Sequence, residues 1–125
     1  MNCDAKFVDN DEEALSRDYD LILANSSLQY CDDWLVTFGN LAKAARPWIF
    51  ISRLHLVEQA QSCQFTDQAY GSNVQVWLID RTEFLEAAEK LGLVTHQDMA
   101  TFETVQTPIG KIEGSAFLFE KIADA

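Results

Sequence analysis

Asp18-Tyr-Asp-Leu-Ile-Leu-Ala-Asn-Ser-Ser-Leu-Gln-Tyr30 is the stretch of sequence from which the fold can be worked out. Its centre, Leu21–Ala24, is an apolar run between a charged start and a polar exit. Such a run is typical of a strand buried on both faces of a parallel sheet, where polar and apolar residues need not alternate. We therefore expect a central parallel strand over residues 19–24.

Short hydrogen-bonding side chains follow this strand directly: Asn25, Ser26 and Ser27. Arg53 and His55 come just after a second apolar run, residues 48–52. Open α/β sheets bind ligands at the carboxyl ends of their strands, so this edge is a candidate ligand site. The ordinary alternatives stay open: Asn and Ser side chains that build a turn, a surface ion pair for Arg53, and a loop contact for His55.

A long helix is predicted between the two strands, because apolar residues recur there at helical spacing: Trp34, Leu35, Phe38, Leu41, Ala42 and Ala45. Asp32 is its expected N-cap. Lys43 and Arg46 complement the helix dipole at the other end, and Pro47 stops the helix. Strand, helix and strand with short connections form a βαβ unit.

Capping boxes predict two more helices. Asn10 with Glu13 begins a short helix over residues 11–16, and Asp80 with Glu83 begins one that Gly92 ends. Between them, residues 53–74 lack clear periodicity, which predicts a long and functional loop.

The C-terminal third is predicted to be strands. Residues 93–99 form one, and residues 102–106 and 116–122 are expected to be antiparallel neighbours. Thr107-Pro-Ile-Gly110 between them matches a type I turn.

Composition narrows the classes of function. With 125 residues, 48% of them hydrophobic, the chain is expected to form a single domain over residues 1–125. A net charge of −11 argues against binding to nucleic acid. The short apolar runs and the lack of a visible signal peptide predict no membrane segment and a cytoplasmic location. Cys3, Cys31 and Cys63 form no paired motif, and no metal site is expected.

The order of predicted elements resembles the C-terminal half of class I S-adenosylmethionine-dependent methyltransferases. Tyr19–Ala24 with Ser27–Tyr30 is similar to the family's fourth strand and its exit, and Trp48–Ser52 is similar to the fifth strand. A bacterial group of such proteins has recognisable counterparts of further residues: Gln64-Phe-Thr66, Tyr70-Gly71, Trp77, Glu83-Phe84 and Gly114–Lys121.

The resemblance implies an α/β fold, a partial Rossmann-like three-layer architecture with a mixed sheet. Its parallel strands are expected near residues 5–8, 19–24, 48–52 and 93–98, with an antiparallel C-terminal strand near 115–122.

The resemblance does not extend to the cofactor cradle of the family. Class I enzymes hold S-adenosylmethionine on a glycine-rich turn after the first strand and on an acid after the second. The glycines of this chain are isolated: Gly39, Gly71, Gly92, Gly110 and Gly114. By resemblance alone, S-adenosylmethionine is the expected cofactor, and the candidate ligand-binding residues are Asn25, Ser26, Ser27, Tyr30, Arg53 and His55, with Asp9 toward the cofactor.

Three functions remain open. The first is a truncated methyltransferase-like domain without autonomous methyl transfer, keeping a small-ligand pocket at the strand ends. The second is an interaction module that works as a homo-oligomer, and the third is a half-enzyme completed by a partner chain. In the third case His55 is the nearest candidate general base.

An apolar strand with an open edge invites pairing with another chain. We expect Ala5–Val8 to pair beside Leu21–Ala24. We also expect the resulting sheet to form a homodimer through exposed apolar surface.

Overall fold

A computed structural model describes residues 10–58, 61–69 and 71–122 of the chain. In chain order the elements are α1 (Asp11–Ala14), β1 (Tyr19–Asn25), η1 (Leu28–Tyr30), α2 (Trp34–Ala44), β2 (Ala45–Val57), β3 (Cys63–Ala69), β4 (Ser72–Asp80), α3 (Arg81–Lys90), β5 (Leu93–Thr107) and β6 (Gly110–Lys121).

The described strands form one mixed six-stranded sheet, as predicted. β1 and β2 are parallel neighbours, with Leu21 opposite Trp48 and Asn25 opposite Ser52. β6 is antiparallel to β2, and β5 is antiparallel to β6, so β5 runs in the same direction as β1 and β2. The α/β fold class is therefore confirmed, while the strand expected at residues 5–8 lies outside the described residues.

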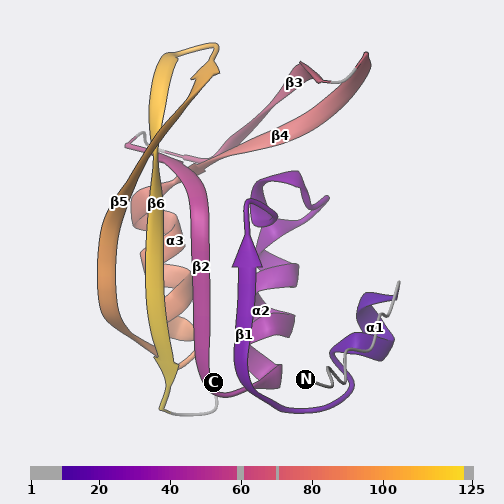
Figure 1. Cartoon of the computed structure of the whole chain (residues 1–125), viewed down its shortest axis with the longest axis vertical. Coiled ribbons are helices and arrows are strands. Elements are labelled where there is room, and N and C mark those ends of the chain that lie inside the picture. Colours follow the sequence, from indigo (N-terminus) through magenta and orange to yellow (C-terminus); the bar gives the residue numbers. More distant parts are fainter. Residues whose placement is uncertain (1–9, 59–60, 70, 123–125) are drawn as a thin grey trace, which may run out of the picture.

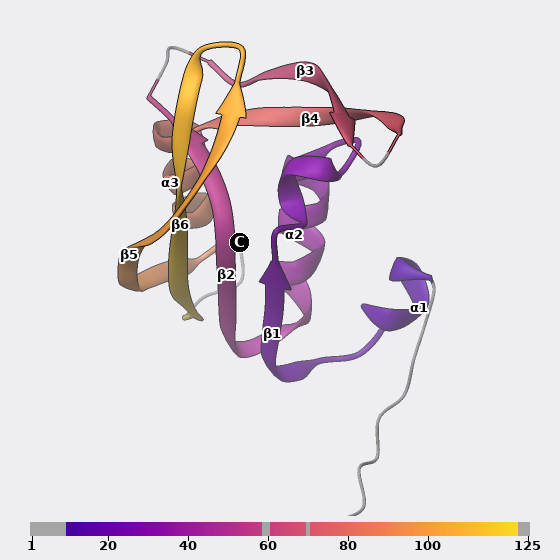
Figure 2. The same cartoon turned by 45° about the horizontal axis from the view of Figure 1, so that its top comes forward.

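Both longer helices cover the same face of the sheet (Figures 1 and 2). Phe38 of α2 stacks on Phe84 of α3 with ring centroids 5.0 Å apart, and Phe84 also contacts Phe117 and Phe119 of β6. All four rings are fully buried. This aromatic cluster is the centre of the core and ties the two helices to the sheet.

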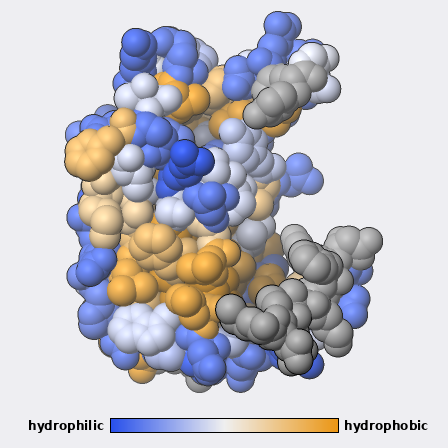
Figure 3. Space-filling model, viewed as in Figure 1, coloured by the Kyte–Doolittle hydropathy of each residue, from blue (hydrophilic) through white to orange (hydrophobic). Residues whose placement is uncertain are grey.

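The opposite face of the sheet carries exposed apolar side chains, so the expectation that β1 is buried on both faces is wrong. Ile22 and Ala24 are buried against the helices, whereas Leu21 and Leu23 are 51% and 68% exposed. The strand therefore follows the ordinary two-residue alternation, with apolar residues on both sides. Figure 3 shows the resulting apolar area on the face turned toward the viewer.

The N-cap of α2 differs from the expected residue by one position. Asp33, and not Asp32, accepts hydrogen bonds from the backbone N–H groups of Leu35 and Val36. The backbone carbonyl of Asp32 instead accepts a hydrogen bond from Trp77 Nε1 at 3.2 Å.

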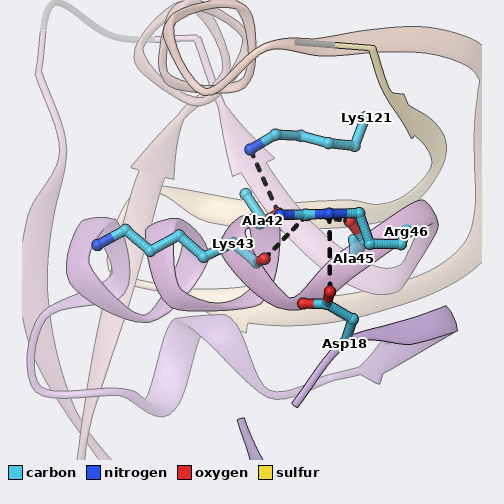
Figure 4. A network of polar contacts seen from close by, with 6 residues as sticks. All are labelled: Asp18, Ala42, Lys43, Ala45, Arg46 and Lys121. Atoms are coloured by element: carbon cyan, nitrogen blue, oxygen red, sulfur yellow. Dashed lines mark hydrogen bonds and ion pairs between the residues drawn. The ribbon is translucent and has the colours of Figure 1, made fainter. Parts of the chain in front are cut away.

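Cations satisfy the carboxyl end of α2 (Figure 4). Arg46 Nη1 donates to the Lys43 and Ala45 carbonyls at 2.9 and 2.6 Å, and Lys121 Nζ of β6 donates to the Ala42 carbonyl at 3.3 Å. Arg46 Nε also lies 3.9 Å from Oδ2 of Asp18, the residue just before β1. Of the two cations predicted to complement the helix dipole, Arg46 makes the contact through its side chain, and Lys121, which was not predicted, makes a second one.

The long loop predicted over residues 53–74 is wrong. β2 continues to Val57, and β3 and β4 form an antiparallel hairpin with Cys63 opposite Leu78 and Ala69 opposite Ser72. The hairpin projects past the carboxyl end of β1 (Figure 1). Within this segment residues 64–66 are extended in β3, and Gly71 has a positive φ just before β4 begins at Ser72.

The starts of α1 and α3 and the position of the last hairpin turn agree with the sequence. The expected pairing of residues 102–106 with 116–122 is wrong, because residues 104–107 pair with 110–113 and residues 116–121 pair with 93–99. Glu13 N and Glu83 N donate to the side chains of Asn10 and Asp80. Thr107 pairs with Gly110 at the tip of the β5–β6 hairpin. β5 is one strand where two were predicted. Among the described residues, no helix has the length and apolarity to cross a membrane.

Candidate functional site

The carboxyl end of β1 is joined by side-chain and backbone hydrogen bonds to residues 52 and 53 of β2, a strand that continues to Val57. Ser52 Oγ donates to Asn25 Oδ1 at 2.9 Å, and Ser26 N donates to the Ser52 carbonyl at 2.9 Å. Gln29 Nε2 donates to Ser26 Oγ at 3.2 Å and to the Arg53 carbonyl at 3.4 Å. The network brings the predicted residues Asn25, Ser26 and Arg53 to one edge of the sheet.

Left-handed backbone occurs on both chain segments that meet at this edge. Ser26 and Arg53 have φ of 51° and 53°, a left-handed conformation that non-glycine residues seldom adopt. Arg53 lies where the β2–β6 register shifts between Ile51 and Leu54, so it is the extra residue of a bulge. Strained backbone of this kind is concentrated at functional sites.

An edge pocket of about 410 Å³ lies beside β1. Its polar lining residues are Asn25, Ser27, Cys31 and Thr37, and the rest of its lining is apolar, including Leu23 and Leu28. Its volume lies within the range of small-molecule sites. At the start of η1 the backbone carbonyl of Ser27 accepts a hydrogen bond from Tyr30 N. The Ser27 hydroxyl makes no capping hydrogen bond there.

A second space, the hairpin cavity, lies between η1, the end of β2, the β3–β4 hairpin and the tip of β5. It has a volume of about 40 Å³. Its polar and aromatic lining residues come from segments far apart in the sequence: Gln29, Tyr30, His55, Phe65, Asp67, Trp77 and Thr107.

His55 lies at the border between this cavity and β5. Its Nε2 is 3.7 Å from Glu103 Oε1, and neither atom has a hydrogen-bond partner. Burial lowers the pKa of His55 below its usual value, the Glu103 carboxylate opposes this shift, and the Arg53 guanidinium adds to it. Burial therefore disfavours the protonated form of His55.

A glycine makes room for Glu103. A Cβ on Gly114, opposite His55 in the sheet, would lie 2.0 Å from Glu103 Oε1 and 2.4 Å from Thr101 Oγ1. The carboxylate and hydroxyl therefore occupy the place of the missing side chain. This is possible because β5 bulges between Ala100 and Thr104.

The predicted site residues thus divide between two places. Asn25 and Ser27 line the edge pocket, while Tyr30 and His55 line the hairpin cavity. Ser26 and Arg53 lie between the edge pocket and the hairpin cavity, and both accept a hydrogen bond from Gln29 Nε2. Asp9 lies outside the described residues.

Sequence reasoning missed Gln29 and Asp67. Gln29 is 3% exposed in a short turn, and its partner at Arg53 is 24 positions away in the sequence. Asp67 belongs to the hairpin that was expected to be a loop. No local pattern marks either residue. Within the described ranges, no group of three His, Cys, Asp or Glu side chains is placed to hold a metal ion.

No protein-family model and no curated protein matches this chain. Solved structures do match. An S-adenosylmethionine-dependent methyltransferase from Methanosarcina mazei superposes with a TM-score of 0.65 and 13% identity, over 94% of this chain and 67% of that one. The fold is methyltransferase-like.

Two bacterial structures agree. A candidate S-adenosylmethionine-dependent methyltransferase from Listeria monocytogenes gives a TM-score of 0.59 at 11% identity, over 85% of this chain and 62% of its own. An S-adenosylmethionine-dependent methyltransferase from Clostridium acetobutylicum gives a TM-score of 0.54 at 9% identity, over 86% of this chain and 60% of its own. At such identities the likeness concerns the fold alone, and the chain spans 60% to 67% of the length of these neighbours.

Proposed function

We propose that this chain is the C-terminal half of a methyltransferase-like domain, with a small-ligand pocket at the strand ends and no autonomous methyl transfer. The observation that supports this most is the place where the carboxyl end of β1 meets the bulge of β2 at Ser52 and Arg53. There Asn25 and Ser27 line a pocket of about 410 Å³, beside two residues of left-handed backbone.

The cofactor chemistry of this site is incomplete. Asn25 and Ser27 supply amide and hydroxyl groups, which suit the polar amino-acid and ribose parts of S-adenosylmethionine. None of the described glycines follows a strand at this edge: Gly39 is inside α2, Gly71 is in the β3–β4 turn, Gly92 precedes β5, and Gly110 and Gly114 belong to β6. A pyrophosphate- or amino-acid-binding backbone turn therefore has no counterpart near Asn25.

Titration calorimetry with S-adenosylmethionine and S-adenosylhomocysteine tests this proposal. We expect dissociation constants weaker than about 100 μM for the chain alone, together with no transfer of a labelled methyl group. Tighter binding that Asn25→Ala abolishes and Asn40→Ala leaves intact would contradict it. Asn40 is the matched control because it is exposed on α2 and is not among the residues that line the edge pocket.

A second candidate function is self-association, either as an interaction module or to complete the site from a partner chain. The exposed apolar face favours it. Leu21 and Leu23 lie beside Trp48 and Phe50 of β2, and none of these four side chains is fully buried. Among the described strands, β1 pairs only with β2, so its other edge is open to pairing.

A further inference from the structure

The backbone of β1 has unpaired hydrogen-bonding groups along its open edge. Ser26 N donates to the Ser52 carbonyl, and Asn25 lies opposite Ser52 in the register. In a parallel pair, the residues before and after Asn25 therefore direct their N–H and C=O groups to β2, and Asn25 directs its own away from β2. Because these directions alternate along a strand, Leu21 and Leu23 share the direction of Asn25. Among the described strands, β1 pairs only with β2, so these outward groups have no strand partner there.

The edge pocket lies beside the carboxyl end of this open edge. Leu23 and Asn25 line it, and so do Ala14 and Leu15 of α1. α1 lies on the side of β1 away from β2 in both views (Figures 1 and 2). Leu41 of α2 also lines the pocket, which places the pocket on the helical side of the sheet. Because α1 bounds this space, it fits one extended segment beside β1 rather than the whole sheet of a second copy.

The surroundings define the side chains that such a segment would carry. None of the residues that line the edge pocket is charged, and most of them are apolar. Side chains of a strand alternate between the two faces of its sheet. One set would enter the pocket, and the other set would lie beside Leu21 and Leu23 on the open face, where these leucines are 51% and 68% exposed. Both sets are therefore expected to be apolar.

Charge determines what flanks this apolar centre. The sequences of α1 (Asp-Glu-Glu-Ala) and β1 (Tyr-Asp-Leu-Ile-Leu-Ala-Asn) contain four carboxylates, three and one, and no lysine or arginine. The whole chain has a net charge of −11. Basic residues at the ends of an incoming segment are attracted to this edge, and acidic residues are repelled. A second copy of the chain would bring the same negative charge, so it is the less favoured occupant of the edge.

We propose that β1 binds an extended segment of another polypeptide, with an apolar centre and basic ends, as an additional strand of the sheet. The backbone groups of Leu21, Leu23 and Asn25 pair with the segment, and an apolar side chain of the segment fills the edge pocket. In this mode of recognition the main-chain hydrogen bonds give affinity and the pocket gives specificity. The inference goes beyond the proposed small-ligand function, because it requires neither S-adenosylmethionine nor methyl transfer.

Amide hydrogen exchange of the full chain, followed by NMR, tests the proposal with the peptide acetyl-Lys-Lys-Val-Ile-Val-Lys-Lys-amide. In the free protein, the amides of Leu21 and Leu23 should exchange fast, while pairing with β2 protects those of Ile22 and Ala24. Saturating peptide should slow exchange at Leu21 and Leu23 at least about tenfold and leave Ile22 and Ala24 nearly unchanged. Slow exchange at all four amides without peptide would overturn the proposal, because the edge would already be covered.

Two altered peptides separate backbone pairing from side-chain contact. N-methylation of two consecutive central residues removes N–H groups from both edges of the peptide and keeps its side chains, so binding should weaken at least about tenfold. Replacing the four lysines by glutamates should weaken binding by a similar factor, because the charge complementarity is reversed. Equal binding of the unmethylated and the N-methylated peptide would overturn the added strand, and equal binding of the lysine and glutamate peptides would overturn the basic partner.

A pair of protein variants makes the same distinction on β1. Leu23→Pro and Leu23→Ala both remove the leucine side chain, but only proline removes the N–H group of the open edge. That N–H group takes no part in pairing with β2, so both variants should keep the native fold, which circular dichroism checks. Peptide binding should be lost in Leu23→Pro and weakened far less in Leu23→Ala, and equal affinities of the two folded variants would overturn the proposal. If Leu23→Pro does not fold, the exchange measurement on the wild type decides. Titration with S-adenosylhomocysteine is independent of these results, so their failure would leave the proposed ligand pocket intact.

Discussion

At the scale of the residue, burial in the folded chain lowers the pKa of His55. It is packed between Arg53 on its own strand and Glu103 on β5, and it shares the hairpin cavity with Asp67 of β3. Burial is the largest influence on its pKa and lowers it, with only partial compensation from Glu103. The charged imidazole is therefore less stable in the folded chain than in the unfolded one.

This gives a prediction with a definite sign. Because the pKa of His55 is lower in the folded state, the unfolded state binds more protons as the pH falls below 6.5. Stability should fall over that window, by less than about 1.4 kcal/mol per pH unit for one group. Urea unfolding of the wild type and of His55→Gln between about pH 7.5 and 5.5 measures it. If both lose stability in parallel, His55 is not the titrating group.

Gly114 is a residue whose close contacts could not be predicted from the sequence. Its place in the strand gives no sign that Thr101 and Glu103 fill the space above it. The two residues reach it only because β5 bulges, and a bulge depends on the pairing of two strands. Gln29 is similar, since its role depends on a carbonyl contributed by Arg53. The polar residues directly after each strand could be predicted, whereas partners from distant segments could not.

At the scale of the element, the amphipathic helices and the parallel pair β1–β2 were predictable because their patterns are local. The β3–β4 hairpin was not. β3 reads Cys-Gln-Phe-Thr-Asp-Gln-Ala, a mostly polar run that gains its structure from pairing with β4. Its partner strand carries the buried residues Val76, Leu78 and Ile79. Strand propensity depends on such neighbours more than on the segment itself.

The start of α2 gives a prediction that separates two adjacent aspartates. Asp33 caps the helix through its side chain, while Asp32 contributes only its backbone carbonyl. Asp33→Ala should therefore lower the free energy of unfolding by about 1 kcal/mol. Asp32→Ala removes the same charge and should change it by less than about 0.5 kcal/mol. Chemical denaturation of the two variants in the same buffer makes the comparison, and equal losses would contradict the assigned cap.

At the scale of the whole molecule, the sheet is covered by helices on one face only, within the described residues. The sequence could not predict this, because the apolar run Leu21-Ile-Leu-Ala24 fits a strand with helices on both faces and also a strand with helices on one face only. The exposed face and the net charge of −11 have opposite effects on self-association. Apolar contact favours it, and like charges on two copies oppose it until salt screens them.

The homodimer proposed above should therefore strengthen with salt. Sedimentation of the wild type is expected to show a larger dimer fraction at about 0.5 M than at about 0.05 M salt, where the Debye length is several-fold longer. Leu23→Lys places a charge at the most exposed leucine of β1 and should give a monomer at both. Leu35→Lys makes the same change on α2, where the leucine is 49% exposed on the helical side, and should leave the dimer intact. A wild-type monomer at micromolar concentration in high salt would exclude self-association through this face, and equal effects of the two lysines would place the contact elsewhere.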